Sequence, residues 1–178
     1  MIVFDASTLI LLAKMEILGL FIADFGEKVA IPEKVKEEVL RGSRYESALI
    51  TKLIQERAMD VLKVRDTKLV RRLIEDFNID VGEAEMLALG IQEKASLAAT
   101  DDRNTIKACK IMNLNFTTAI AFLVRAYEKR LLKREDALGK LQELQSFARY
   151  KRAIIETARR QIEGVDEHGE KDGEHTNE

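Results

Sequence analysis

Short apolar runs alternate with amphipathic helical segments along this chain, and that alternation is the feature that most constrains its fold. The runs at 2–4 and 28–31 are largely apolar, which is typical of strands buried on both faces. The segments that follow place apolar residues at helical spacing, as Val35, Val39 and Leu40 do. Strands that alternate with helices predict a parallel sheet joined by right-handed crossovers. We therefore predict an α/β protein, a three-layer α/β/α sandwich around a parallel sheet of four or five strands.

The expected elements extend from residue 2 to residue 162. The predicted strands are residues 2–4, 28–31, 61–64, 96–100 and, as a short edge strand, 114–116. The predicted helices are residues 7–14, 17–25, 32–41, 47–58, 69–77, 84–94, 102–112, 119–131, 134–146 and 149–162. We expect one domain over 1–162, with a core over 1–125 and a helical extension over 126–162.

The charges are distributed unevenly along the chain. Residues 163–178 hold seven acids and one lysine, so the net charge of −2 leaves +4 for the other residues. Within 125–162, eleven lysines and arginines accompany five acids. Because 163–178 has almost no apolar residue, we expect a disordered acidic tail there. The mildly basic remainder permits a polyanionic partner and equally fits a solvated basic surface.

Cysteine and histidine usage excludes several kinds of site. Cys109 is the only cysteine, so the chain has no disulfide framework and no cysteine-based zinc site. Both histidines, His168 and His175, lie in the acidic tail, which excludes a histidine-dependent triad or metal site in the fold. No apolar run approaches the roughly 20 residues of a membrane span, and no basic leader opens the chain. We expect a cytoplasmic protein without a membrane partner.

Carboxylates stand where the predicted strands end. Asp5 ends the first strand, Asp101 and Asp102 follow the fourth, and Glu83 lies in the first turn of the preceding helix. Glu38 lies on the helix after the second strand. Functional groups of an open parallel sheet gather at this edge, and carboxylates without His or Cys favour Mg²⁺ or Mn²⁺. Such ions activate water and stabilise the charge that builds on a phosphate during displacement.

Two of these positions also suit a purely structural role as helix caps. Asp5 could cap the first helix through neighbouring N–H groups. Either Asp101 or Asp102 must cap the helix that follows the fourth strand. Two interpretations therefore fit the carboxylates at this edge of the sheet, a metal site and a set of helix caps.

The two predicted helical acids have alternatives as well. Asp80 and Glu83 have the spacing of a capping box. Glu38 follows Lys34 by four residues, as in a surface ion pair. Glu85 is a rival to Glu83, but the two lie about 200° apart on a helix. We prefer Glu83, because the first turn lies nearer the strand ends.

Four motifs occur in an order that resembles the PIN domain. They are Asp5 after an apolar strand, Pro32-x-x-Val35-x-x-Glu38-Val39, Gly82-Glu83-Ala84-Glu85, and Thr100-Asp101-Asp102. The resemblance covers about residues 1–125, and the Gly-Glu-Ala-Glu form resembles the prokaryotic and archaeal branch, which includes VapC-type toxins. It implies an Mg²⁺- or Mn²⁺-dependent ribonuclease, either a toxin or an RNA-processing nuclease.

The resemblance also implies roles for single residues. Asp5, Glu38, Glu83 and Asp101 would form the catalytic and metal-binding quartet. Asp102 would be an additional ligand, and Ser7, Glu85 and Thr100 would support the site. Many members have Asp where this chain has Glu83, and both Thr-Asp and Thr-x-Asp patterns occur here, so the choice between Asp101 and Asp102 stays open. The stretch 126–162 is longer than a minimal toxin needs.

These observations favour a metal-dependent endoribonuclease that cleaves single-stranded RNA. Exposed cations would steer the RNA backbone, and the candidates are Lys68, Arg71, Arg72, Arg103 and the basic residues of 125–162. A toxin would have an antitoxin protein as partner. The alternative is a non-catalytic PIN-like scaffold that binds RNA or protein. A phospho-acceptor signalling domain is disfavoured, because Ala6 follows Asp5 and no Lys ends a final strand.

Oligomeric state is a separate question. Ile120, Leu123 and Leu131 form an apolar stripe that suits burial in the core. The alternative is a homodimer, since dimers are common in the resembled family.

Overall fold

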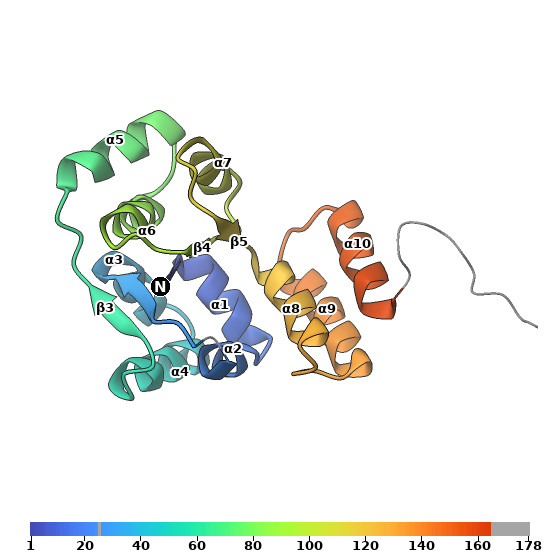
Figure 1. Cartoon of the computed structure of the whole chain (residues 1–178). Coiled ribbons are helices and arrows are strands. Elements are labelled where there is room, and N and C mark those ends of the chain that lie inside the picture. Colours follow the sequence, from blue (N-terminus) through green and yellow to red (C-terminus); the bar gives the residue numbers. More distant parts are fainter. Residues whose placement is uncertain (25, 165–178) are drawn as a thin grey trace, which may run out of the picture. The chain divides into compact units, whose positions relative to one another are not determined.

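The computed structural model describes residues 1–24 and 26–164. The chain divides into two compact units, Met1–Phe122 and Leu123–Glu178. The first unit is built on a sheet (Figure 1) and the second is helical in its described part. Whether 1–162 behaves as one domain stays a prediction.

The first unit contains a five-stranded parallel sheet with the strand order β3-β2-β1-β4-β5. The strands are β1 (Ile2–Phe4), β2 (Val29–Pro32), β3 (Asp60–Leu62), β4 (Leu97–Ala99) and β5 (Phe116–Thr117). Every residue of β1 and β2 is buried, as their apolar sequences predict. The predicted fold class is therefore confirmed.

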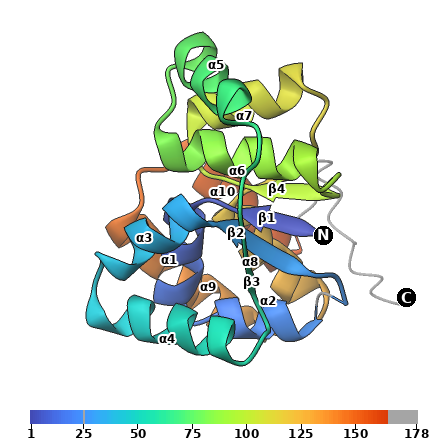
Figure 2. The same cartoon turned by 90° about the vertical axis from the view of Figure 1, so that its left-hand side faces the viewer.

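Helices cover both faces of this sheet. They are α1 (Ala6–Lys14), α2 (Leu18–Asp24), α3 (Glu33–Leu40), α4 (Arg44–Gln55), α5 (Thr67–Phe77), α6 (Val81–Gln92) and α7 (Arg103–Ile111). In Figure 2, α6 with α5 and α7 lies over one face, while α1, α2 and α4 lie over the other. Three layers follow from this arrangement, with α3 packed against β2, β3 and α6.

The predicted elements are present, and their ends differ by a few residues. Pro32 is the last residue of β2 rather than part of the next helix, because its ψ of 164° is extended. The helix predicted at 47–58 begins at Arg44, directly after the extended residue Ser43. The edge strand predicted at 114–116 lies at Phe116–Thr117, where Thr117 pairs with Ala99.

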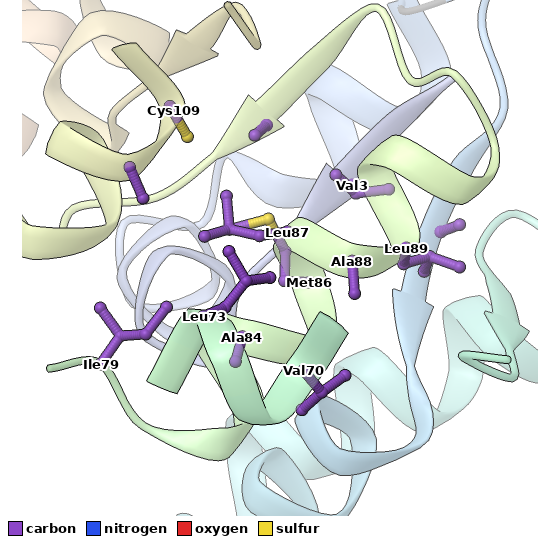
Figure 3. Close-up of a cluster of buried hydrophobic side chains, with 13 residues drawn as sticks. Val3, Val70, Leu73, Ile79, Ala84, Met86, Leu87, Ala88, Leu89 and Cys109 are labelled. Atoms are coloured by element: carbon purple, nitrogen blue, oxygen red, sulfur yellow. The ribbon is translucent and has the colours of Figure 1, made fainter. Parts of the chain in front are cut away.

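The side chains between the sheet and α5, α6 and α7 form one buried cluster. Figure 3 shows Val3, Leu73, Met86 and Leu87 converging there, with Cys109 on α7 at its margin. Burial raises the pKa of the Cys109 thiol to about 11, so the thiol stays neutral. Gly90 permits the close approach of α6 to β1, because a Cβ there would lie 3.3 Å from Val3. This packing fixes the direction in which α6 presents its first turn.

The second unit continues from α8 (Ala119–Glu128), which crosses the boundary, into α9 (Arg134–Phe147) and α10 (Arg152–Glu163). α9 and α10 pack against each other. α10 begins at Arg152 rather than 149, after the extended Lys151, and ends at Glu163, where the following Gly164 has a left-handed φ of 77°. The predicted acidic tail begins inside α10 at Glu163, and its residues 165–178 lie outside the described residues.

The apolar stripe predicted at Ile120, Leu123 and Leu131 is largely buried. Ile120 and Leu123 are buried and Leu131 is half-buried. Among residues 1–24 and 26–164, no single helix is long and apolar enough to cross a membrane. α1 and α2 reach that length and hydrophobicity only as a pair, which is bent by 106°.

Candidate functional site: a carboxylate cluster at the sheet edge

The strand order reverses between β1 and β4. From β1 the chain proceeds to β2 and β3, and it then passes back over β1 to β4 and β5. The carboxyl ends of β1 and β4 are adjacent, since Phe4 pairs with Ala99 and the Asp5 N–H donates to Ala99 O at 3.1 Å. Ligands of open α/β sheets bind at such a reversal. The loops after these two strands carry Asp5, Asp101 and Asp102.

The two carboxylate oxygens of Asp5 lie in different environments. Oδ1 accepts hydrogen bonds from the Thr8 N–H at 2.7 Å and the Ser7 hydroxyl at 3.1 Å, and so caps α1. Oδ2 is buried and accepts no hydrogen bond from any described residue. The predicted cap is therefore real, but it occupies only one oxygen. Ser7 orients Asp5, as the resemblance implied.

Burial strongly disfavours the charged form of Asp5. The side chain is 2% exposed, and this desolvation raises its pKa to about 6. The polar groups of Thr100 and Thr8 beside the carboxylate favour its charged form and so lower the pKa of Asp5. The charge of Asp101 adds to the rise. A cation beside Oδ2 would offset both causes of the raised pKa.

Glu83 lies beside this group. It forms a capping box with Asp80, in which Glu83 Oε2 accepts from the Asp80 N–H at 2.9 Å and Asp80 Oδ1 accepts from the Glu83 N–H at 2.9 Å. Burial raises the pKa of Glu83 to about 7, and the charges of Asp102, Asp80 and Asp5 add to the rise. The structure thus brings Glu83 close to both strand-end loops.

Asp101 and Asp102 have different structural partners. Asp102 Oδ1 accepts from the Thr105 N–H at 2.7 Å and from its hydroxyl at 3.0 Å, so Asp102 caps α7. Asp101 Oδ2 accepts from the Thr8 hydroxyl at 2.8 Å and from the Ala119 N–H at 3.0 Å. The prediction that one of the two caps the next helix is confirmed for Asp102.

Glu38 reaches toward the cluster from α3. Partial desolvation raises its pKa, and the charge of Asp80 adds to the rise. A Cβ on Gly82 would lie 3.0 Å from Glu38 Oε2, so the glycine leaves room for this carboxylate beside α6. Lys34 pairs with Glu37 at 2.9 Å instead. The alternative that Glu38 serves an ordinary ion pair with Lys34 is wrong.

Glu85 has a different partner from Glu83. Its Oε2 accepts from the Lys34 N–H at 3.2 Å, near the start of α3, where Pro32 provides no side-chain cap. Thr100 is fully buried, and its hydroxyl accepts from the Asp102 N–H at 3.3 Å. The geometry therefore favours Glu83 over Glu85 as a member of the cluster and gives Thr100 a supporting position.

Two further residues, Thr8 and Asp80, take part in the cluster although their roles do not follow from the motifs. Thr8 contacts both Asp5 and Asp101, and its position three residues after Asp5 is the signal that could have indicated it. Asp80 was considered only as a cap, yet its charge raises the pKa of both Glu38 and Glu83.

The cluster fits a hard divalent cation by chemistry rather than by preformed geometry. Among the described residues, no three Asp, Glu, His or Cys side chains converge closely enough to hold one ion. The unpartnered Asp5 Oδ2 and the raised pKa values of Asp5, Glu38 and Glu83 are nevertheless what such a cation would relieve. Binding would require carboxylates that now serve as caps to turn toward a shared ion.

The predicted RNA-steering cations are exposed in the first unit. Lys68, Arg71 and Arg72 lie in the amino-terminal half of α5, and Arg103 is the first residue of α7. Asn78, at the other end of α5, accepts from the Asn104 side chain at 3.2 Å. Arg103 is therefore the one of the four that lies at the carboxylate edge.

The strand order and the carboxylates at its reversal define an α/β/α protein with an acidic cluster at the carboxyl edge of its sheet. The family model DUF3368, described as a PIN domain, matches residues 1–164. The chain therefore belongs to the PIN-domain family, whose members are generally nucleases. No curated protein and no solved structure matches it.

Proposed function

We propose that this PIN domain is an Mg²⁺- or Mn²⁺-dependent endoribonuclease acting on single-stranded RNA. Asp5, Glu38, Glu83 and Asp101 would hold the metal, with Asp102 as an additional ligand. The observation that carries the proposal is Asp5 Oδ2, a buried carboxylate oxygen without a hydrogen-bond partner among the described residues, beside other carboxylates. When bound, a hard divalent cation supplies an activated water and charge stabilisation at phosphate.

The protein's own residues position these ligands. Ser7 and Thr8 fix Asp5 Oδ1, which leaves Oδ2 directed away from the cap. Thr8 and the Ala119 N–H hold Asp101. Burial keeps bulk water away from the Asp5 carboxylate, and the low dielectric there strengthens the attraction between this carboxylate and a cation.

A second candidate function is a non-catalytic scaffold for RNA or protein. It is favoured by one observation: Asp5, Glu83 and Asp102 each already serve a helix cap, and no three acids converge among the described residues. Calorimetric titration with Mn²⁺, followed by incubation with single-stranded RNA in Mn²⁺ and in chelator, separates the two functions. Binding and chelator-sensitive cleavage that both disappear in Asp5→Asn support the nuclease, and absence of Mn²⁺ binding supports the scaffold.

The biological setting is part of the proposal. The nuclease would act in the cytoplasm, either as a toxin held by an antitoxin protein or in RNA processing. The reading frame beside its gene would distinguish these settings, since an antitoxin is normally encoded there. Sedimentation of the full chain tests the homodimer.

A further inference from the structure

One side of α7 carries only positive charges. Arg103, Lys107 and Lys110 occur at helical spacings of four and three residues, which places them on one face. All three are exposed, while Thr105 and Ala108 are buried on the opposite face. Residues 103–118 contain no Asp or Glu. Among the described residues no carboxylate pairs with any of the three cations.

This cationic face begins at the carboxylate cluster. Asp102 caps α7, its charge raises the pKa of Glu83, and Arg103 follows it directly. From Arg103 to Lys110 the helix rises by about 10 Å, because each residue adds about 1.5 Å. A stacked strand rises about 3.4 Å per nucleotide, so the face spans about three nucleotides.

The face ends at an open hollow beside the edge strand β5. The hollow has a volume of about 400 Å³ and is lined by Cys109, Lys110, Asn113, Leu114, Asn115 and Phe116. Phe116 is half-buried, packs against the core, and has the Lys110 ammonium 5.6 Å from its ring centre. Asn115 donates to Ser96 O at 3.4 Å through its Nδ2, and both asparagines are exposed.

The chemistry of this hollow suits an unpaired nucleobase. Single-stranded bases stack on aromatic rings and pair their edges with amide groups. Lys110 can exchange the ring of Phe116 for a phosphate, since the ammonium is attached to a flexible stem. A ring, two amides and a cation within one hollow therefore match the parts of one nucleotide.

The cations of α5 match an RNA path less well. Lys68 and Arg72 lie in the amino-terminal half of that helix. Exposed Glu75 and Asp76 follow them on the way to Asn78, the end of α5 that contacts α7. Acidic side chains at this place repel a phosphate backbone. α7 has no such interruption.

From these observations we infer that single-stranded RNA crosses the first unit along α7. Its phosphates contact Arg103, Lys107 and Lys110, and one base stacks on Phe116. The inference rests on the proposed ribonuclease function and names the path by which the strand reaches the carboxylate cluster.

The test uses the full chain carrying Asp5→Asn, in chelator, so that binding is measured without cleavage. The probe is a short fluorescent RNA without self-complementarity, titrated between about 50 and 200 mM salt. Lys107→Gln with Lys110→Gln should weaken binding and lower the salt slope by about 0.7 for each lost phosphate contact. The matched control is Lys28→Gln with Lys63→Gln, two exposed lysines flanking β2 and β3. It should leave the slope unchanged.

The base subsite has its own pair of variants. Phe116→Leu keeps an apolar side chain in the core but removes the stacking face, and should weaken RNA binding by about 5-fold to 150-fold. Phe116→Tyr should retain the affinity. Binding of polyphosphate, which has no bases, should depend on the lysines and not on Phe116. Thermal melting of each variant establishes that it is folded.

Several results would overturn the inference. The RNA does not follow α7 if the α7 variants leave the RNA affinity unchanged. The same conclusion holds if Lys68→Gln with Arg72→Gln lowers the RNA affinity more than the α7 variants do. Lysine-dependent binding of polyglutamate without any effect on RNA indicates an acidic protein as the occupant instead. A failure of the proposed ribonuclease function gives a different result, because the unmodified chain then neither binds Mn²⁺ nor cleaves RNA. The RNA-binding measurements on the variants still show whether RNA follows α7.

Discussion

The hydroxyl of Thr8 donates a hydrogen bond to Asp101 Oδ2 at 2.8 Å, across 93 residues of sequence. Thr8 also donates its backbone N–H to Asp5 Oδ1 at 2.7 Å. One fully buried side chain therefore ties the loop after β1 to the loop after β4. The two carboxylates that the strand reversal brings together are held in register by this threonine.

Thr8→Val tests that link with a side chain of nearly the same shape. The cap on α1 uses the backbone N–H and survives, while the bond to Asp101 is lost. Since Asp101 keeps the Ala119 N–H, the free energy of unfolding should fall by about 1 kcal/mol. Mn²⁺ affinity should fall as well, because Asp101 is then held by the Ala119 N–H without the Thr8 hydroxyl. Chemical denaturation and calorimetry measure the two effects.

The matched control is Thr105→Val, which removes the hydroxyl that binds Asp102 Oδ1 at 3.0 Å. Both threonines are fully buried, so the loss of stability should be similar. If Thr105→Val weakens Mn²⁺ binding more than Thr8→Val does, Asp102 rather than Asp101 is the ligand.

Asp5→Asn should distinguish the capping role of Asp5 Oδ1 from the proposed metal-binding role of Oδ2. Asn caps a helix about as well as Asp, so α1 keeps its cap. Removing a buried charge next to Asp101 should leave the metal-free protein equally or more stable. The rise in melting temperature caused by Mn²⁺ should disappear. At about 100 times the dissociation constant, that rise corresponds to about 2.7 kcal/mol in the unmodified chain.

Asp66→Asn provides the same chemical change at an ordinary cap. Asp66 Oδ1 accepts from the Leu69 N–H at 2.9 Å at the start of α5, and its side chain is exposed. The Mn²⁺-induced shift should persist in this variant. An undiminished Mn²⁺-induced rise in the melting temperature of Asp5→Asn would show that Asp5 is not a metal ligand.

The metal-free protein should lose stability as the pH rises from about 4 to 7. Burial raises the pKa of Asp5 from 3.8 to about 6, so in this range the folded state binds more protons than the unfolded state. Stability from this group is therefore fully present below pH 4 and is lost as pH rises through 6, by about 3 kcal/mol. Glu83, with a pKa of about 7, acts in the same direction.

The difference in unfolding free energy between the unmodified chain and Asp5→Asn isolates the contribution of Asp5, since the other titrating groups are common to both. The unfolding free energy of Asp5→Asn should depend less steeply on pH across the same range. Saturating Mn²⁺ at pH 7 should restore the loss in the unmodified chain. A stability difference that stays constant between pH 4 and 7 would contradict the raised pKa of Asp5.

Sequence reasoning located the carboxylates because their positions follow from topology. Strand ends are visible as the last residue of an apolar run, and parallel strands bring Asp5 and Asp101 to one edge. The capping box of Asp80 and Glu83 was equally visible, because it depends on local spacing. What depends on local chain geometry could be predicted.

Contacts between distant segments could not be predicted in this way. The position of Glu38 Oε2, 3.0 Å from where a Cβ on Gly82 would lie, depends on the approach of α3 to α6. The engagement of Glu85 with the Lys34 N–H depends on the same approach. Whether an oxygen of Asp5 lacks a partner depends on burial from all sides, which no spacing in the sequence encodes.

Glu83→Gln and Glu85→Gln form a matched pair on one helix. Gln can still accept from the Asp80 N–H, so the capping box survives in the first variant. Because a charge beside Asp102 and Asp5 is removed, the metal-free protein should gain stability at pH 8 while Mn²⁺ affinity falls. Glu85→Gln should leave Mn²⁺ affinity unchanged. The reverse pattern in calorimetry would assign the ligand to Glu85.

Gly82→Ala tests whether the space beside α6 serves Glu38. A Cβ at 82 would lie 3.0 Å from Glu38 Oε2, the mobile end of a long side chain, so the carboxylate shifts and the backbone stays in place. Replacing a helical glycine by alanine stabilises by up to about 1 kcal/mol, so the unfolding free energy should hold or rise while Mn²⁺ affinity falls. Gly139→Ala in α9 is the control, because nothing lies within 4 Å of its added Cβ. It should give the gain in stability and leave Mn²⁺ affinity unchanged. Equal Mn²⁺ affinity in both variants, measured by calorimetry, would exclude Glu38 from the metal site.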